Sequence, residues 1–445
     1  MRPRPQRIPA VHRPPVMQPA VTLPRATPPP GATPPPGATR RCFAIGIAGG
    51  LALLAASAAV RATDWALSLD ARLVSSDANP PFMDGGLGTV RYGSEESGLQ
   101  LGRIRFAVTQ PLGELWSAHL DASMFDDKDR SPVGVTEAYL LFRPYPHEGW
   151  RFRLKAGGFY APISLENRAP GWESPYTLSS SAIDSWLAVE VRTIGLEGTL
   201  DWLGMRSGHD FDVGMTGAVF GWNEGAGTVL ATDGFSLTDR QTPLFGRVGQ
   251  PQAPPLYGAE PFLQLDHRAG FYGGLEVRYL DRVVLRALHY DNRADPTAED
   301  ELSDFYAWHT TFNSAGVRLE ADHGFTAIVQ WLDGKTETVD DGSSERWPFR
   351  AEYALVSERF GRNTLSARYD RFEVDSSGDE GYGAQSGHAW TVAYSYDAGA
   401  HWRFTLEWLQ VVSSSFTRAD LGGASLQTET QLQLAVRYAL GSAIR

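Results

Sequence analysis

Hydrophobic and polar residues alternate along most of the chain after residue 62. In HWRFTLEW (residues 401–408), apolar side chains occupy every second position and polar side chains fill the gaps. SAHLDASM (117–124) and QLQLAVRYAL (431–440) repeat this arrangement. A period of two is typical of β-strands that have one apolar and one polar face. No stretch after residue 62 has the ~20 consecutive apolar residues that a transmembrane helix needs. The pattern therefore predicts an all-β fold.

Sixteen such segments can be traced, and their connections alternate between short turns and longer polar loops. This order is typical of a transmembrane antiparallel β-barrel with short periplasmic turns and long extracellular loops. A barrel of about sixteen strands is wide enough to leave a channel. The expected strands are 65–74, 97–109, 114–125, 134–143, 149–159, 186–200, 209–222, 271–279, 282–290, 306–321, 324–333, 348–357, 362–372, 386–397, 401–412 and 427–440.

Tryptophans give a second sign of a membrane barrel, because aromatic belts lie where lipid meets water. Packing in a soluble core is the alternative explanation. The expected periplasmic belt is Trp65, Trp116, Trp150, Trp202 and Trp402, and the expected extracellular belt is Trp222, Trp308, Trp331, Trp390 and Trp408. The alternation changes phase near Gly102, Gly195 and Gly316, where β-bulges or wrong strand phases are the two explanations.

Residues 1–62 have a different character from the rest of the chain. They contain eight Arg and no Lys, Asp or Glu, and residues 1–41 are rich in Pro. The apolar run CFAIGIAGGLALLAASAAV (42–60) is followed by a small-residue cleavage pattern that ends at Ala62. We expect residues 1–62 to be a cleaved secretory signal and residues 63–445 to form one outer-membrane barrel domain. An uncleaved membrane anchor is the alternative.

The composition of residues 63–445 excludes several classes of function. The only cysteine, Cys42, lies in the expected signal, so disulfides, cysteine metal sites and thiol catalysis are excluded. Removing the eight Arg of the signal from the formal charge of −12 leaves about −20, which argues against nucleic-acid binding. We find no sequence motif of a hydrolase, metalloprotease or P-loop enzyme, so no enzyme activity, catalytic residue, cofactor or metal is expected.

Cations occupy one face of the segment RFRLKAGGFY (151–160), opposite apolar residues. In a barrel this polar face lines the lumen, where basic side chains select anions by their field. We expect an anion path formed by Arg103, Arg105, Arg151, Arg153 and Lys155. The alternative is an ordinary lumen of mixed charge, because several acidic residues are also expected to face the lumen: Asp121, Glu276, Glu352, Asp370 and Glu407.

Three stretches, KAGGFYAPISLEN, WHTTFNSAGVRLE and QTETQLQLAVRYAL, resemble the phosphate-selective porin O/P family of outer-membrane channels. The resemblance implies a sixteen-stranded barrel, a homotrimer, a third loop folded into the barrel and passage of phosphate-type anions. This chain departs from the family where GGFYAP lacks lysines, and it contains only three lysines, Lys128, Lys155 and Lys335. A lysine-lined phosphate site is therefore not expected.

The segment 161–186 follows the basic strand directly and is long, polar and rich in small residues. Its position and the resemblance predict a constriction loop, and an outward surface loop is the alternative. Its charged residues are Glu166, Arg168, Glu173 and Asp184. A second loop, 291–304, is acidic; it is a candidate for binding divalent cations or bridging to lipopolysaccharide, and a solvated charge run is the simpler interpretation.

These observations predict a multi-pass protein of the bacterial outer membrane that acts as a porin for small hydrophilic solutes, with a preference for anions. Its expected partners are outer-membrane lipid, lipopolysaccharide and small anions. Two other classes remain open. A non-conducting structural or adhesive barrel has a lumen filled by apolar or fully paired side chains, and an outer-membrane enzyme has a Ser/His pair on one rim.

Overall fold

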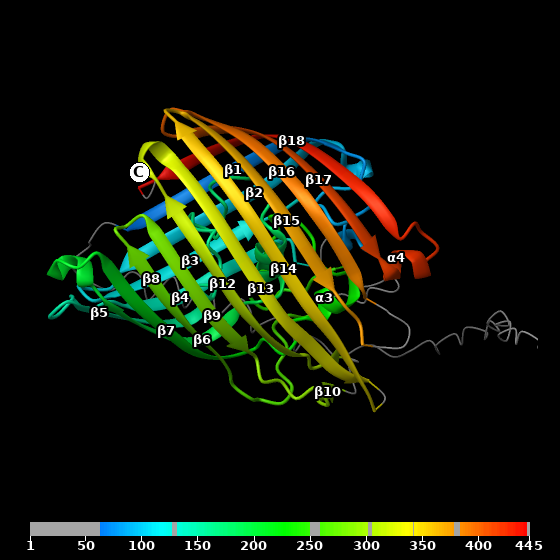
Figure 1. Ribbon diagram of the computed structural model, residues 1–445, viewed down its shortest axis with the longest axis horizontal. Coiled ribbons are helices and arrows are strands. Elements are labelled where there is room, and N and C mark those ends of the chain that lie inside the picture. The colour runs from blue at the N-terminus through cyan, green and yellow to red at the C-terminus, as the bar shows by residue number, and fades with distance from the viewer. Residues whose placement is uncertain are drawn as a thin grey trace, which may run out of the picture. The chain divides into compact units, whose positions relative to one another are not determined.

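The computed structural model is a closed antiparallel barrel of sixteen strands (Figure 1). It describes residues 63–126, 131–249, 259–300, 305–340, 342–377 and 383–442, so the expected signal and its cleavage lie outside the described residues. The order around the barrel is β1-β18-β17-β16-β15-β14-β13-β12-β9-β8-β7-β6-β5-β4-β3-β2. The first and last strands pair through Ala66 and Gly441, so the wall closes without a free edge.

The barrel strands are β1 (Asp64–Ser76), β2 (Gly98–Pro111), β3 (Trp116–Met124), β4 (Val133–Phe142), β5 (Trp150–Phe159), β6 (Thr193–Trp202), β7 (Phe211–Gly221), β8 (Gly270–Tyr279), β9 (Val283–Asp291), β12 (His309–Glu320), β13 (Phe325–Asp340), β14 (Ser343–Phe360), β15 (Asn363–Val374), β16 (Gln385–Ala398), β17 (Trp402–Ser415) and β18 (Leu426–Gly441). Short turns gather at one end, the short-turn rim, and longer connections at the other, the long-loop rim. The start of β1 and the end of β18 both lie at the short-turn rim.

Helices occur only as short pieces within the described loops. They are α2 (Ala182–Val189), α3 (Thr228–Thr232) and α4 (Phe416–Asp420), with 3-10 turns η1 (Phe82–Asp84), η2 (Ser94–Glu96), η3 (Gly204–Ser207) and η4 (Asp322–Gly324). Two further strands, β10 (Glu299–Asp300) and β11 (Phe305–Tyr306), pair with each other outside the barrel. None of the described helices is long and apolar enough to cross a membrane.

The sequence pattern predicted the barrel and its strand count correctly, but two of its details are wrong. The expected strand 186–200 is split, because residues 182–189 form α2 and the strand begins at Thr193. The apolar residues of 186–189 were read as the start of the strand, because a helix that is buried on all sides is also rich in apolar residues. The expected loop 334–347 is largely strand, because β13 and β14 extend to residues 340 and 343.

Bulges explain only one of the three phase changes. Between β1 and β2 the register shifts so that Asp70 faces Arg103 and Ala71 faces Leu101, which makes Gly102 the extra residue as predicted. Gly195 and Gly316 lie in unbroken registers. At Gly316 the phase seemed to change because Phe312 faces the interior, where it is 1% exposed. A further register shift, between Asp121 and Ala122 on β3, was not predicted.

The outward face of the barrel carries the apolar belts. Trp65, Trp116, Trp150 and Trp402 are 41–49% exposed near the short-turn rim, and Trp222 and Trp390 are 46% and 49% exposed toward the other rim. Trp308 does not belong to the belt, because it packs against the interior core beside Trp347. Glu352 was expected to face the lumen, but its neighbours Ala351 and Tyr353 are the buried, inward residues of β14.

Candidate solute path in the barrel lumen

The connection between β5 and β6 folds into the barrel instead of leaving it. Its helix α2 is buried along its whole length and packs on β14 and β15. Ser181 begins the helix because its side chain accepts a hydrogen bond from the Asp184 N–H at 3.2 Å. Asp184 and Glu166 are both fully buried. The structure therefore places these two predicted loop residues inside the lumen; their role in a constriction stays a prediction.

An ion-pair network fastens this loop to the wall formed by β15 and β17. Arg368 lies 2.6 Å from Glu166 and 2.8 Å from Asp370, and all three side chains have no exposed surface. Glu407 accepts hydrogen bonds from the backbone N–H groups of Leu178 and Ser179. Buried charges are tolerated only when they are paired and hydrogen-bonded, which this arrangement achieves. The loop is therefore bound to the wall rather than hanging free.

A second network fastens the other side of the loop to β1, β2 and β18. Glu173 accepts from Arg103 at 2.8 Å and also binds Arg437. Arg105 pairs with Asp121 on β3. Although burial alone would raise it, Arg437 and Arg103 lower the pKa of Glu173, so this carboxyl stays ionised. Arg103 and Arg105, two of the five predicted path residues, are thus sealed against the loop and are 3% and 7% exposed.

A related cluster holds the next long connection, between β7 and β8, to the same wall. Asp239 lies within 2.7 Å of both Arg72 and Arg91. Burial opposes ionisation of Asp239, but the two guanidinium groups outweigh it and hold its pKa well below the usual range. The carboxylate of Asp70 adds a third pair, at 3.0 Å from Arg72. This side of the lumen is therefore closed by paired charges.

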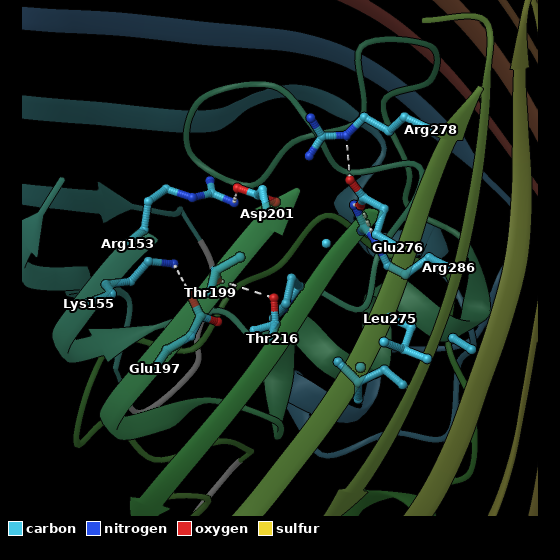
Figure 2. Close-up of a pocket in the computed structure, with 15 residues that line it drawn as sticks. Arg153, Lys155, Glu197, Thr199, Asp201, Thr216, Leu275, Glu276, Arg278 and Arg286 are labelled. Carbon is cyan, nitrogen blue, oxygen red and sulfur yellow. Dashed lines mark hydrogen bonds and ion pairs between the residues drawn. The ribbon is translucent and has the colours of Figure 1, made fainter. Parts of the chain in front are cut away.

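The three cations of β5 face the open part of the lumen, but each has a carboxylate partner on β6. Arg151 and Arg153 lie 2.9 and 3.2 Å from Asp201, and Lys155 lies 3.2 Å from Glu197. Figure 2 shows Arg153 and Lys155 pointing toward these two acids. Asp201 and Glu197 were missed from the sequence because their β6 segment was read together with α2 as one strand, although their alternation with apolar residues marks them as inward.

Two cavities that share four lining residues form a vestibule between this wall and the loop. Their volumes are about 210 Å³ and 390 Å³, and Pro162, Glu276, Arg278 and Arg286 line both. Glu276 binds Arg278 at 2.6 Å and also Arg286, as Figure 2 shows. The charged residues lining the vestibule are six cations and four acids: Arg153, Lys155, Arg168, Arg278, Arg286, Arg318, Glu137, Glu197, Asp201 and Glu276.

The predicted loop residue Arg168 reaches this vestibule rather than the sealed side. It pairs with Glu320, and Arg318 Nε lies 3.3 Å from the same carboxylate. Arg286 donates to the Ser164 carbonyl at 2.7 Å, which ties the loop to β9. The vestibule thus has an excess of cationic over acidic side chains beside the loop.

Apolar side chains fill the half of the interior near the long-loop rim, and we call this half the packed half. Trp186 of α2 lies at its centre, with ring centroids 5.0 Å from Phe349 and 5.3 Å from Phe312. Phe220 and Tyr290 continue the stack at 5.1 Å. These residues are at most 3% exposed. Among the residues that the structure describes, the wet vestibule therefore ends below an aromatic core.

Carboxyl groups buried beside the packed half have raised pKa values. Burial raises the pKa of Glu190 to about 7, although the Val229 and Leu230 N–H groups and the Trp186 indole N–H favour its charged form. Burial also raises the pKa of Asp233 to about 7. For Asp184, burial and then the neighbouring Glu166 raise the pKa well above its usual value. Glu190 and Asp233 are therefore partly protonated near neutral pH.

No arrangement typical of a hydrolase or metal centre occurs in the described part of the chain. His289 hydrogen-bonds Asn313 on the neighbouring strand at 2.9 Å. Within the described residues, no group of three His, Cys, Asp or Glu side chains is placed to hold a metal ion. In the acidic loop, Asp291 binds His309 at 3.1 Å and Asp295 binds Arg268 at 2.7 Å, while residues 301–304 lie outside the described residues.

Comparisons with known proteins find similar solved structures only. No protein-family model matches the chain, and no curated protein sequence is similar to it. Among solved structures, the outer membrane channel DcaP of Acinetobacter baumannii is similar at 12% identity and a TM-score of 0.49, covering 85% of this chain and 96% of that one. OmpT of Vibrio cholerae is similar at 9% identity and 0.46, covering 86% and 100%. An anion-selective porin from Comamonas acidovorans is similar at 13% identity and 0.46, covering 85% and 99%.

The likeness concerns the barrel alone, and the phosphate-selective porin O/P family stays a resemblance in residues. The chain itself has the features of a membrane barrel. Its wall is closed, its outward face carries aliphatic side chains between two tryptophan belts, and its interior is polar at one end. The protein is a multi-pass outer-membrane β-barrel of sixteen antiparallel strands.

Proposed function

We propose that the protein is a porin-type channel that passes small polar solutes with a weak preference for anions. The observation that carries this proposal is the vestibule, whose lining of six cations and four acids lies inside a membrane-spanning barrel. A net excess of guanidinium groups in a confined lumen attracts anions at close range, while charges beyond about 8–10 Å are screened by salt. The preference is weak because most of these cations have acidic partners.

Conductance of the purified protein in a planar lipid bilayer tests this proposal. We expect small current steps, because the packed half leaves little room, and a reversal potential in a KCl gradient that has the sign of chloride preference. Replacing chloride with phosphate tests the solute that the family resemblance implies. A reversal potential of the opposite sign would contradict the anion preference, and a bilayer that stays silent would contradict the channel itself.

A non-conducting structural or adhesive barrel is the second candidate, and the packed half favours it. An interior filled by aromatic and fully paired side chains is what such a barrel requires. Conductance distinguishes the two candidates: only a channel conducts when single protein molecules insert into the bilayer.

The assembly and the lipid partners are two further proposals. We propose a homotrimer on the resemblance, and light scattering of the detergent-solubilised protein measures the mass that tests it. We propose that lipopolysaccharide contacts the outer face near the long-loop rim, where the outward Arg346 and Arg350 are exposed beside Glu337 and Asp333. Substituting both arginines with Gln and measuring co-purified lipopolysaccharide tests that contact.

A further inference from the structure

The barrel wall has a weak seam between β4 and β5. These strands share only five residue pairs, from Ala138–Gly158 to Phe142–Leu154, whereas the other neighbouring strands of the barrel share eight to sixteen. Five pairs extend about 15 Å along strands that tilt by ~45°, so they cover less than half of an apolar band ~25 Å tall. The upper part of β4, residues 133–137, therefore lacks β5 as its neighbour in the outer half of the membrane.

A segment of the β7–β8 connection closes this seam, and we call residues 240–247 the strap. The Leu244 N–H donates to the Val135 carbonyl at 2.7 Å, so the strap takes the place of the missing strand. The Arg247 N–H donates to Ser131 Oγ at 2.9 Å, just before β4. The strap thus completes the wall by contacts that are independent of β5.

Glycines on both sides of the seam give the strap room. A Cβ at Gly134 of β4 would lie 2.6 Å from Pro243, and one at Gly158 of β5 would lie 2.7 Å from Leu244. These distances are too short for a side chain, so the strap fits only against these two glycines. Tight apolar contacts of this kind close the wall where the hydrogen-bond ladder between β4 and β5 has ended.

Arg192 joins the parts that meet at the seam. Its guanidinium donates to the carbonyls of Thr136 on β4, Ala188 on α2 and Thr242 beside the strap's centre, and to the Tyr160 hydroxyl after β5. It also lies 3.6 Å from the centroid of the Tyr160 ring. These contacts are non-covalent, and they add to the hydrogen bonds of Leu244 and Arg247 that hold the strap against β4.

The two sides of the seam differ in chemistry. On the outside, Phe245 of the strap is 64% exposed at the level of the lipid. On the inside, Glu137 and Tyr160, which flank the seam, line the 390 Å³ cavity of the vestibule. That cavity continues to a stacked Tyr160–Trp172 pair, with centroids 4.2 Å apart, and to the guanidinium groups of Arg168, Arg286 and Arg318. Guanidinium groups bind carboxylates, and the aromatic wall suits an apolar body.

We propose that the seam is a lateral portal through which an amphiphilic carboxylic acid passes between the outer membrane leaflet and the vestibule. The strap moves aside, the apolar body enters between β4 and β5, and the carboxylate binds the arginines of the cavity. The portal rests on the proposed function in one respect, because the vestibule is its onward route to the periplasm.

A disulfide that locks the strap tests the portal. A Cβ at Gly246 would lie 3.2 Å from Ser131 Cβ, close to the 3.5–4.5 Å of a disulfide, and 2.8 Å from the Pro243 carbonyl oxygen. The double substitution Ser131→Cys and Gly246→Cys therefore joins the strap to β4 if the turn at 243–246 shifts away from the new side chain. The sequence has one cysteine, Cys42, which lies outside the described residues. The single variants S131C and G246C are the matched controls, and disulfide formation is verified by mass spectrometry.

The readout is uptake of radiolabelled dodecanoate by cells that carry the protein in an outer membrane without another fatty-acid channel. We expect the oxidised double variant to take up dodecanoate about tenfold more slowly than the wild type, because the locked strap can no longer move aside. Adding reductant should restore uptake. Arg168→Gln should lower affinity for dodecanoate without changing the maximal rate. The portal is contradicted if the verified lock leaves uptake unchanged, or if the wild type takes up no more than cells without the protein.

Ion conductance separates this proposal from the channel proposal. The lock should change the conductance of the purified protein by less than about twofold, because ions follow the axial route past Arg153 and Lys155. A silent bilayer together with lock-sensitive dodecanoate uptake would refute the channel and support the portal. Normal conductance with lock-insensitive uptake would refute the portal alone.

Discussion

The two halves of the interior are built by opposite rules. In the half near the short turns, Arg153, Asp201 and Glu276 line a cavity and form ion pairs within a strand or between adjacent strands. In the packed half, Trp186 and Phe349 exclude water, and charged groups such as Arg368 are admitted only when fully paired. The difference shows that a barrel of porin size does not imply an open pore. The loops that fold into the lumen decide how much of it stays open to water.

The largest effect is expected from removing Arg368, which joins the loop to the wall. Arg368→Ala leaves Glu166 and Asp370 buried without a counter-charge, which should cost about 3–5 kcal/mol of unfolding free energy. The exposed pair Arg350–Asp333 is the matched control, and Arg350→Ala should cost less than about 1 kcal/mol. Urea titration followed by gel mobility of the unheated protein measures both. Equal losses would show that the buried network does not hold the loop.

The second prediction concerns the centre of the packed half. Trp186→Ala removes the ring between Phe312 and Phe349 and should cost about 3 kcal/mol or more. We also expect conductance to rise, because water enters the cavity that the ring leaves. The exposed belt residue Trp390 is the control, since Trp390→Ala leaves the interior untouched. Unchanged conductance in a folded W186A barrel would mean that the core is not what limits passage.

The pKa of Glu190 predicts how the packed half responds to pH. Burial raises its pKa to about 7 in the fold, above its usual value of 4.5, so the neutral form is favoured. Its contribution to stability is therefore full below pH 4.5 and is lost as the pH rises toward 7, by about 3 kcal/mol. Asp233, whose pKa burial also raises to about 7, acts in the same direction. Glu190→Gln should flatten the dependence of the thermal midpoint between pH 5 and 8, and an unchanged slope would assign it to Asp233 and Asp184.

The smallest effect is expected in the wet half. Replacing Arg151, Arg153 and Lys155 with Glu changes three cations that lie beside Asp201 and Glu197, and the reversal potential should move toward cation preference by several-fold in permeability ratio, about 1 kcal/mol. Asp201→Asn should move it the opposite way. If both variants keep the reversal potential of the wild type, the other arginines of the vestibule set the selectivity.

The wall was predictable from the sequence, and the interior was not. Alternation reports only which face a side chain occupies, so Arg153 and Lys155 were correctly expected to face inward. It carries no information on which loop meets that face. Asp201 and Trp186 were lost for the same reason, because an apolar helix next to a strand was read as one long strand. The long-range pairs of Arg368 and Glu407 lie beyond any local pattern.

The ion pairs that hold the loop impose an order on assembly. Glu166 is separated by 202 residues from Arg368, and Glu173 by 264 residues from Arg437. The loop is made early in synthesis, whereas its partners lie on strands close to the C-terminus. Arg103 on β2 precedes the loop and can pair with Glu173 early, but the pairs with Arg368 and Arg437 form only once β15 and β18 are made. β18 then pairs with β1 around the loop. A chain truncated before β15 would carry unpaired acids on an uncovered loop, which is a form that quality-control proteases in the periplasm can recognise.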